Sequence, residues 1–207
     1  MCLEPFASAG SFPESPQGAL TVWPLQLIFH TIGWYLLYED DQVGQAEGLI
    51  RSERLDRLAL ARSEGGLRRS PEEHRRSLQR VERLLHHCGG IYFGEELAPQ
   101  LAIASSSARL RDTALETLRF SCTASAFAFI REGVARYPIE HTRFSLPLAG
   151  DRWWRHPRAP HVLRPNGKDD SHPYPVELDL PSWTLACDVD LRNWLFGFGG
   201  ELRIEAP

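Results

Sequence analysis

The chain has 207 residues, of which 43% are hydrophobic, and a formal net charge of −4 at pH 7. This length can hold one or two domains with apolar cores, and the composition is that of a globular protein rather than a disordered one. The negative charge argues against nucleic-acid binding over the whole surface, and no apolar run has the length of a membrane span or of a secretory signal. We therefore expect a cytoplasmic protein without a membrane partner.

The first sixty residues predict a leader followed by strands. Residues 1–20 are rich in Ser, Pro and Gly without periodicity, which predicts a poorly ordered leader or the remnant of an upstream domain. Residues 25–29 and 34–38 are apolar, β-prone runs separated by a short link with a glycine, which is typical of a hairpin. Residues 48–62 predict a strand, a tight turn near 54–56 and a second strand.

A helix is predicted from residue 71 to residue 88. Ser70 suits the N-cap, Pro71 suits the first helical position, and Glu72 and Glu73 are favourable in the first turn. Apolar residues follow at helical spacing, and Gly89 ends the helix. The arginines on its other face are most simply explained as solvated surface.

The second half of the chain predicts an α+β unit. Strands are expected over 115–122, 141–146, 175–180, 182–186 and 201–205, and helices over 124–136 and 188–198. Residues 147–172 are polar and predict a long loop. With 175–180 and 182–186 taken together as one strand region, the element order is strand, helix, strand, strand, helix, strand, which suits a ferredoxin-like α+β sandwich.

The sequence indicates neither a metal centre nor a catalytic motif. Its four cysteines are widely separated and form no Cys-x-x-Cys pair: Cys2, Cys88, Cys122 and Cys187. His86 and His87 are adjacent and would point about 100° apart on a helix, so they could not readily share a metal ion. P-loop, Gly-x-Ser-x-Gly and His-Glu-x-x-His motifs are absent from the sequence. We expect no metal, no cofactor and no enzymatic activity.

Two groups of motifs resemble the WYL domain of transcriptional regulators and its C-terminal extension. The run Trp23-Pro24-Leu25-Gln26-Leu27 is followed by Gly33-Trp34-Tyr35-Leu36 and then by Arg51-Ser52-Glu53-Arg54-Leu55-Asp56-Arg57-Leu58, at the separation of the family's signature. The run Asn193-Trp194-Leu195-Phe196-Gly197-Phe198-Gly199-Gly200-Glu201-Leu202-Arg203-Ile204 resembles the closing element of the extension. Glu53 departs from the pattern, because the family's signature has Phe at this position.

The resemblance implies a mixed β and α+β architecture. An Sm-like, SH3-type β-barrel is expected over residues 21–110, with the helix at 71–88 as an insertion, and the ferredoxin-like extension over 111–207. The barrel's first strand, expected before Trp23, has no counterpart in the sequence pattern. The insertion is similar to that of a CRISPR-associated subgroup of WYL proteins.

The resemblance also implies a homodimeric sensing module. The helix-turn-helix that precedes the WYL domain in the family has no counterpart in these residues. Operator DNA would be a partner only if such a helix-turn-helix exists.

The candidate ligand site consists of Tyr35, Arg51, Arg54 and Arg57. The arginines are three residues apart, and a strand bent by a tight turn would bring them together with Tyr35 on one concave face. Guanidinium groups bind phosphates at two points, and a tyrosine ring can stack on a base. The resemblance likewise implies a nucleotide or nucleic-acid ligand at these positions.

The neighbours of this site leave one alternative open. Asp56 would orient an adjacent arginine by a salt bridge, whereas Trp34 is expected in the core because large aromatic side chains dominate burial. In the alternative, the arginines pair with Glu47, Glu53 and Asp56 as ordinary surface structure.

A second basic and aromatic cluster consists of Arg152, Trp153, Trp154 and Arg155. Aromatic residues interleaved with arginine suit single-stranded nucleic acid, although a surface loop anchored by tryptophan is the simpler alternative. The sequence therefore leaves two functions open. The first is a ligand-sensing module of a WYL-type regulator of CRISPR or phage defence. The second is a non-enzymatic protein-interaction scaffold that assists a CRISPR effector or a transcription complex.

Overall fold

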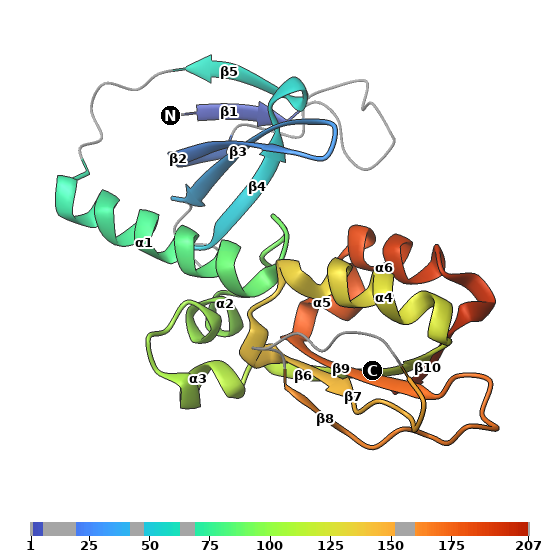
Figure 1. Cartoon of the computed structure of the whole chain (residues 1–207). Coiled ribbons are helices and arrows are strands. Elements are labelled where there is room, and N and C mark those ends of the chain that lie inside the picture. Colours follow the sequence, from blue (N-terminus) through green and yellow to red (C-terminus); the bar gives the residue numbers. More distant parts are fainter. Residues whose placement is uncertain (1, 6–19, 42–47, 63–68, 152–159, 207) are drawn as a thin grey trace. The chain divides into compact units, whose positions relative to one another are not determined.

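A computed structural model describes residues 2–5, 20–41, 48–62, 69–151 and 160–206, and the chain forms two compact units (Figure 1). The first unit contains Met1–Leu85 and Ile91–Arg111, and the second contains His86–Gly90 and Asp112–Pro207. Each unit has one five-stranded sheet and helices, so the architecture is mixed α and β. None of the described helices combines the length and the hydropathy that a membrane crossing requires.

The sheet of the first unit is antiparallel and has the strand order β4-β3-β2-β1-β5. Its strands are β1 (Cys2–Pro5), β2 (Leu20–His30), β3 (Gly33–Asp40), β4 (Ile50–Arg54) and β5 (Leu58–Arg62). The predicted hairpin is confirmed by the pairing of β2 with β3, and Thr31 between them has a φ of 54°, in the left-handed region that tight turns use. The 3-10 turn η1 (Leu55–Arg57) links β4 to β5, as the sequence predicted.

Strand β1 corrects the prediction of a poorly ordered leader. Cys2–Pro5 pair with both β2 and β5, and Leu3 is 4% exposed in a cluster with Val22 and Leu36. The sequence pattern did not reveal this strand, because four residues are too few to show a clear alternation. Residues 6–19 lie outside the described residues. The pairing of the described strands leaves β4 and β5 at the two edges, so the sheet is open and not a closed barrel.

Three described helices begin in the first unit: α1 (Pro71–Cys88), whose last residues belong to the second unit, α2 (Leu97–Ile103) and α3 (Ala108–Asp112). The predicted start of α1 is confirmed by a capping box, in which the Glu73 amide donates to Ser70 Oγ at 3.2 Å and the Ser70 amide donates to Glu73 Oε2 at 2.8 Å. The arginines of α1 are only partly a solvated face. Arg80 donates to the Gly48 carbonyl at 2.6 Å, and Arg83 donates to the Ala104 carbonyl at 2.9 Å.

Glu39 on β3 forms the ion pairs that attach α1 to the sheet. Arg69, just before the helix, forms an ion pair with Glu39 at 2.9 Å, and Arg80 lies 4.0 Å from the same carboxylate. The Arg69 guanidinium also lies over the ring of Trp23, the cross-strand partner of Glu39. The helix predicted as an insertion within residues 21–110 is therefore attached to the sheet of the first unit by ion pairs.

Gln100 on α2 provides hydrogen bonds to an edge strand. Its Oε1 accepts from the Ile50 amide at 2.9 Å, and its Nε2 donates to the Ile50 carbonyl at 2.8 Å and to the Phe93 carbonyl at 3.2 Å. Gln100 and Ile50 are both fully buried. The side-chain amide therefore gives the first residue of β4 the two hydrogen bonds that a further strand would otherwise supply.

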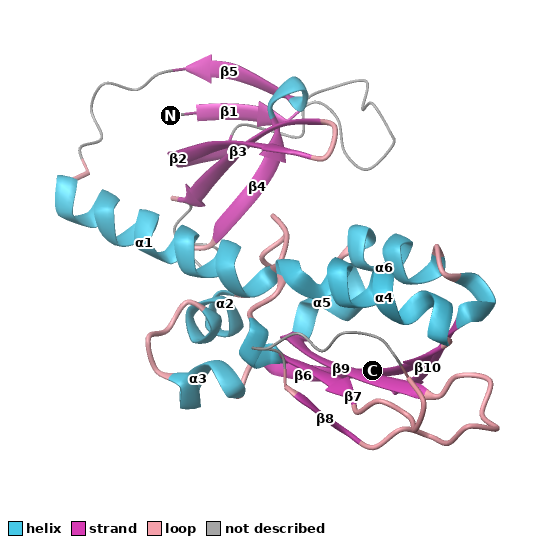
Figure 2. Ribbon diagram, in the orientation of Figure 1, coloured by secondary structure: helices cyan, strands magenta, loops and turns pink. Residues whose placement is uncertain are grey.

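The second unit is an α+β sandwich with the strand order β10-β6-β9-β7-β8. Its strands are β6 (Leu115–Cys122), β7 (Thr142–Ser145), β8 (His161–Leu163), β9 (Tyr174–Pro181) and β10 (Leu202–Ala206). Helices α4 (Ala124–Gly133), α5 (Ser182–Cys187) and α6 (Val189–Phe196) cover one face of the sheet (Figure 2), and the short turns are η2 (Val134–Arg136), η3 (Ile139–His141) and η4 (Gly199–Glu201). The core lies between these layers and includes Phe120, Phe127, Leu178 and Leu191.

Two elements of the second unit differ from the sequence prediction. His161–Leu163, within the expected loop, form β8, which pairs in parallel with β7. Ser182–Cys187 form helix α5, although their aromatic and β-branched residues suggested a strand. Pro181, the last residue of β9, lies opposite Leu115, the first residue of β6. A longer β9 would therefore have no residue of β6 to pair with. The chain forms a helix at this point, and the helix buries Thr184.

An ion-pair network occupies the sheet face opposite the helices. Arg143 on β7 donates to Glu177 at 2.6 Å and to both carboxylate oxygens of Asp179 at 2.6 and 2.7 Å, and Thr117 donates to Asp179 at 2.7 Å. Burial alone would raise the pKa of Asp179, but the hydrogen bonds from Arg143 and Thr117 outweigh it and hold the pKa below its usual value.

Replacing Gln100 with leucine should destabilise the first unit. The buried amide and carbonyl of Ile50 would lose their partners at about 1–3 kcal/mol each, so we expect the free energy of unfolding to fall by about 3 kcal/mol. Urea denaturation would measure the loss, and hydrogen–deuterium exchange would show it as reduced protection of β4. Gln79→Leu, at an exposed glutamine of α1, is the control and should cost less than about 0.5 kcal/mol. An equally small cost for Gln100→Leu would contradict the role assigned to Gln100.

The stability of the second unit should decrease in acid because of Asp179. A carboxyl group whose pKa is lowered by folding stabilises the native state above its unfolded pKa of about 3.9, and this stabilisation is lost as the pH falls through the lower, folded value. Asp179→Asn should therefore flatten the dependence of unfolding free energy on pH below about pH 4. Urea denaturation at a series of pH values measures this slope, with the exposed Glu116→Gln as control. A slope as steep as that of the wild type would disprove the effect.

Candidate functional site

The register of β3 and β4 decides which predicted site residues can meet. Tyr35 lies directly opposite Arg54, and Tyr38 lies directly opposite Arg51. Opposite residues of an antiparallel pair point to the same face of the sheet, whereas successive residues alternate between faces. Tyr35 and Arg54 therefore share one face and Arg51 points to the other. The predicted convergence of all three arginines with Tyr35 is wrong, because Arg51 and Arg54 are an odd number of residues apart on one strand.

Arg51 is engaged by acidic partners within the first unit. Its Nη1 donates to Glu95, and its Nε lies 3.7 Å from the buried carboxylate of Asp40. Beside it, burial raises the pKa of Tyr38 to about 12, so this phenol remains neutral at ordinary pH. Arg51 thus forms structural ion pairs beside the core, but with acids other than Glu47, Glu53 and Asp56, which the structural alternative named.

Arg54 forms a two-point ion pair with Asp56 across the start of η1. Its Nε donates to Oδ1 at 3.0 Å and its Nη2 donates to Oδ2 at 2.6 Å, which is the orienting contact expected of Asp56. The hydrogen bonds raise the pKa of Arg54 and lower that of Asp56, so both groups are charged. The Arg54 guanidinium lies beside Gly33, which has no side chain. A Cβ added to Gly33 would lie 3.7 Å from Arg54 Nε.

Aromatic rings complete this face of the hairpin. The rings of Tyr35 and His30 meet edge to face, with their centroids 6.3 Å apart. His30 was not among the sequence candidates. Its position opposite Gly33 at the end of the hairpin is the signal that could have identified it, once the turn is placed at Thr31 and Ile32.

Arg57 is the third arginine of the motif and lies in η1. Among the described residues, it forms no hydrogen bond and no ion pair within 4 Å. Its charge acts on Glu53: burial raises the pKa of Glu53, while the Arg54 amide and the attraction of Arg57 partly oppose this rise. Arg57 is thus the arginine of the signature with the most capacity for an added anion.

The face that Tyr35 shares with Arg54 is therefore a small polar surface of two rings and a guanidinium–carboxylate pair, with Arg57 at the adjoining turn. The second predicted cluster, Arg152, Trp153, Trp154 and Arg155, lies outside the described residues and stays a prediction. The part of the chain that the structure describes holds no group of three or more His, Cys, Asp or Glu side chains arranged for a metal ion.

Trp34 does not lie in the core as the sequence suggested. It is 55% exposed, and its ring meets that of Phe29 edge to face at a centroid distance of 5.6 Å. These two residues are cross-strand partners near the tip of the hairpin, whereas β1 pairs with β2 at Leu20 and Thr21, near the opposite end. Apart from β3, no described strand pairs with β2 at the hairpin tip, so Trp34 stays exposed there.

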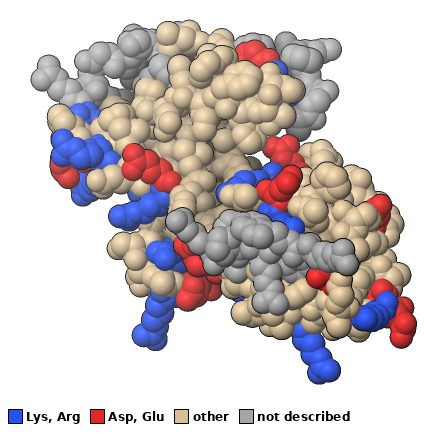
Figure 3. Space-filling model, viewed as in Figure 1, with Lys and Arg blue, Asp and Glu red and all other residues tan. Residues whose placement is uncertain are grey.

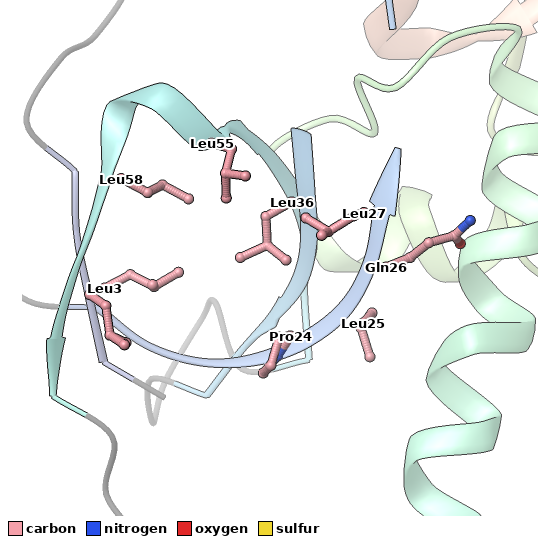
Figure 4. A pocket seen from close by; sticks show the side chains of 9 residues that line it. Leu3, Pro24, Leu25, Gln26, Leu27, Leu36, Leu55 and Leu58 are labelled. Atoms are coloured by element: carbon pink, nitrogen blue, oxygen red, sulfur yellow. The ribbon is translucent and has the colours of Figure 1, made fainter. Parts of the chain in front are cut away.

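An apolar pocket of about 460 Å³ lies on the sheet face opposite Tyr35. Figure 4 shows the strands curving around it, with the side chains of Leu3, Leu36, Leu55 and Leu58 directed toward one another. Its complete lining is Leu3, Pro24, Leu25, Gln26, Leu27, Leu36, Leu55, Leu58 and Leu60. The sequence did not reveal this pocket, because leucines that alternate along strands are equally typical of a filled core.

Comparisons with known proteins add no assignment to this geometry. No protein-family model, no curated protein and no solved structure matches the chain. The positions of Tyr35, Arg54 and Arg57 and the leucine pocket are therefore the basis for inferring function.

Buried Tyr38 should contribute more to the free energy of unfolding than exposed Trp34. Tyr38 is 4% exposed and packs in the cluster that contains Leu3, so Tyr38→Ala should lower the free energy of unfolding by about 3–5 kcal/mol. Trp34→Ala removes a larger but mostly exposed side chain and should cost less than about 1 kcal/mol. Urea denaturation of the two variants measures both values. Equal losses would show that Trp34 is buried in solution and would contradict the described hairpin.

Proposed function

We propose that this protein is a non-enzymatic ligand-sensing module of the kind found in WYL-type transcriptional regulators. Its ligand would be a nucleotide or single-stranded nucleic acid, bound through Tyr35, Arg54 and Arg57. The observation that carries the proposal is the direct cross-strand pairing of Tyr35 with Arg54, next to the turn that contains Arg57. A ring that can stack on a base is thus paired with a guanidinium that can bind a phosphate, and Arg57 follows in the adjoining turn.

The arrangement of elements supports the same family. Five antiparallel strands with a 3-10 turn between the two edge strands favour an SH3-type or Sm-like topology for the first unit. The order β10-β6-β9-β7 favours a ferredoxin-like fold for the second. The triplet that resembles the family begins β3, and the arginine motif extends over β4, η1 and β5. The family resemblance also supports a homodimer, a cytoplasmic location and a role in CRISPR or phage defence.

Phosphate binding would use the donors that Asp56 leaves available. Asp56 takes Nε and Nη2 of Arg54, so Nη1 and the whole guanidinium of Arg57 can donate to a phosphate. The negative charge of Asp56 offsets part of the attraction. Stacking on Tyr35 must then supply much of the affinity, and oligonucleotides should bind more tightly than inorganic phosphate.

A protein-interaction scaffold is the second candidate function. It is favoured by large apolar side chains that are exposed around the hairpin tip, namely Phe29, Ile32 and Trp34. Aromatic anchors are enriched where protein interfaces contribute most energy. An accessory role at a CRISPR effector or a transcription complex is the form of this function that the family resemblance implies.

Titration with short fluorescent single-stranded DNA and RNA would test ligand sensing. Arg54→Ala and Tyr35→Ala should each weaken binding by about tenfold, the effect of losing one stacking or charged contact. Arg75→Ala, at an exposed arginine of α1, is the matched control and should bind like the wild type. If Arg54→Ala and Tyr35→Ala bind as tightly as the wild type, this site is wrong. A copurifying protein that is retained by both variants would then favour the scaffold.

A further inference from the structure

We propose that the leucine pocket of the first unit binds a single aliphatic chain with an anionic head group, for which Arg57 is the charge partner. The pocket lies on the face of β3 that carries Leu36, whereas Tyr35 points to the opposite face. The proposed pocket shares Arg57 with the proposed nucleotide site, but it does not depend on base stacking on Tyr35 or on Arg54.

The residues that line the pocket favour an apolar ligand. It is contributed by β1, β2, β3, η1 and β5, and seven of its nine lining residues are leucines. Gln26 is the polar residue in the lining, and Figure 4 shows its amide directed away from the leucines. A bound water needs two to four polar partners, which these side chains do not offer. Branched aliphatic side chains without an aromatic ring suit a flexible alkyl chain better than a planar ligand.

The size and the opening of the pocket suit a small molecule. Its volume of about 460 Å³ lies within the range of about 300–1,000 Å³ typical of ligand sites. Leu27, Leu55 and Leu60 line the pocket and are nevertheless exposed, so the pocket opens to solvent. On the face of the molecule shown in Figure 3, the surface formed by the first sheet is mostly uncharged. Exposed leucines around a concavity are typical of a binding site.

The positive charge of Arg57 favours an anionic head group. It lies in η1 between two lining residues, Leu55 and Leu58, and makes no hydrogen bond or ion pair with the other described residues. A planar guanidinium binds a carboxylate at two points. Glu53 is the opposing carboxylate, because it pairs across the strands with Leu36 and so shares the pocket's face. Burial raises the pKa of Glu53, and the attraction of Arg57 acts against this rise, so Arg57 lies close enough to Glu53 to act on this face.

Isothermal titration calorimetry with the full chain tests the proposal. The probes are dodecanoate, dodecanol and dodecyltrimethylammonium, all kept below the concentrations at which they form micelles. Dodecanoate should bind saturably with one ligand per chain, the alcohol more weakly and the cation most weakly. Arg57→Gln should weaken dodecanoate binding by about tenfold and leave binding of the alcohol unchanged.

The pocket wall is tested by a matched pair of leucine variants. Leu60 lines the pocket and is 62% exposed, whereas Leu110 on α3 is 53% exposed and lies outside the lining. Leu60→Glu should weaken dodecanoate binding by about tenfold or more, because it places a charge in the apolar wall, and Leu110→Glu should bind like the wild type. Leu27→Glu probes the same wall from β2 if circular dichroism shows that Leu60→Glu does not fold.

Three results would overturn the proposal. The first is the absence of saturable dodecanoate binding, and the second is an equal loss of binding in the pocket variants and in Leu110→Glu. The third is unchanged dodecanoate affinity in Arg57→Gln, which would remove the head-group partner. Arg54→Ala should bind dodecanoate like the wild type, so failure of the nucleotide site and failure of the lipid-like site are distinguishable.

Discussion

The hydrogen bonds between Gln100 and the backbone of Ile50 are the constraint on which the first unit depends. They satisfy the amide and the carbonyl of a buried residue at the start of β4, where no further strand continues the sheet. With β4 held in place, its register against β3 sets Arg54 opposite Tyr35 and directs Arg51 to the other face. A side chain on a short helix, fifty residues away in the sequence, thus supports the geometry of both candidate sites.

Ion pairs attach helix α1 to the sheet, as hydrogen bonds attach α2. Glu39 lies on β3 directly opposite Trp23, and it attracts Arg69 and Arg80 from the helical segment. The half-buried carboxylate of Glu39 requires cationic partners, which Arg69 and Arg80 supply. Each arginine also donates a hydrogen bond to a neutral oxygen. The helix that resembled an insertion is therefore part of what stabilises the sheet. Its exposed positions remain the solvated surface that the sequence suggested.

The hairpin of β2 and β3 presents different chemistry on its two faces. One face carries Tyr35, His30 and the Arg54–Asp56 ion pair, which suits a phosphate and a base. The other face carries the leucines of the pocket and continues to the exposed rings of Phe29 and Trp34. Strict alternation along a strand makes this separation possible within eight residues. Turn η1 contributes to both faces, because Asp56 binds Arg54 while Leu55 lines the pocket.

Local patterns in the sequence determined most of the elements. The hairpin, the capped helix after Ser70, the turn between β4 and β5, and the alternation of strands and helices in the second unit all have short-range signals that operate within a few residues. Strand β1, helix α5 and the exposure of Trp34 lack such signals, because each depends on which distant strand is present to pair with or to cover it. The site shows the same division. Sequence spacing predicted Tyr35, Arg54 and Arg57 together with Arg51, and only the cross-strand register separated Arg51 from them. Register is a relation between strands that no single strand encodes, and the leucine pocket likewise needs five elements to be brought together.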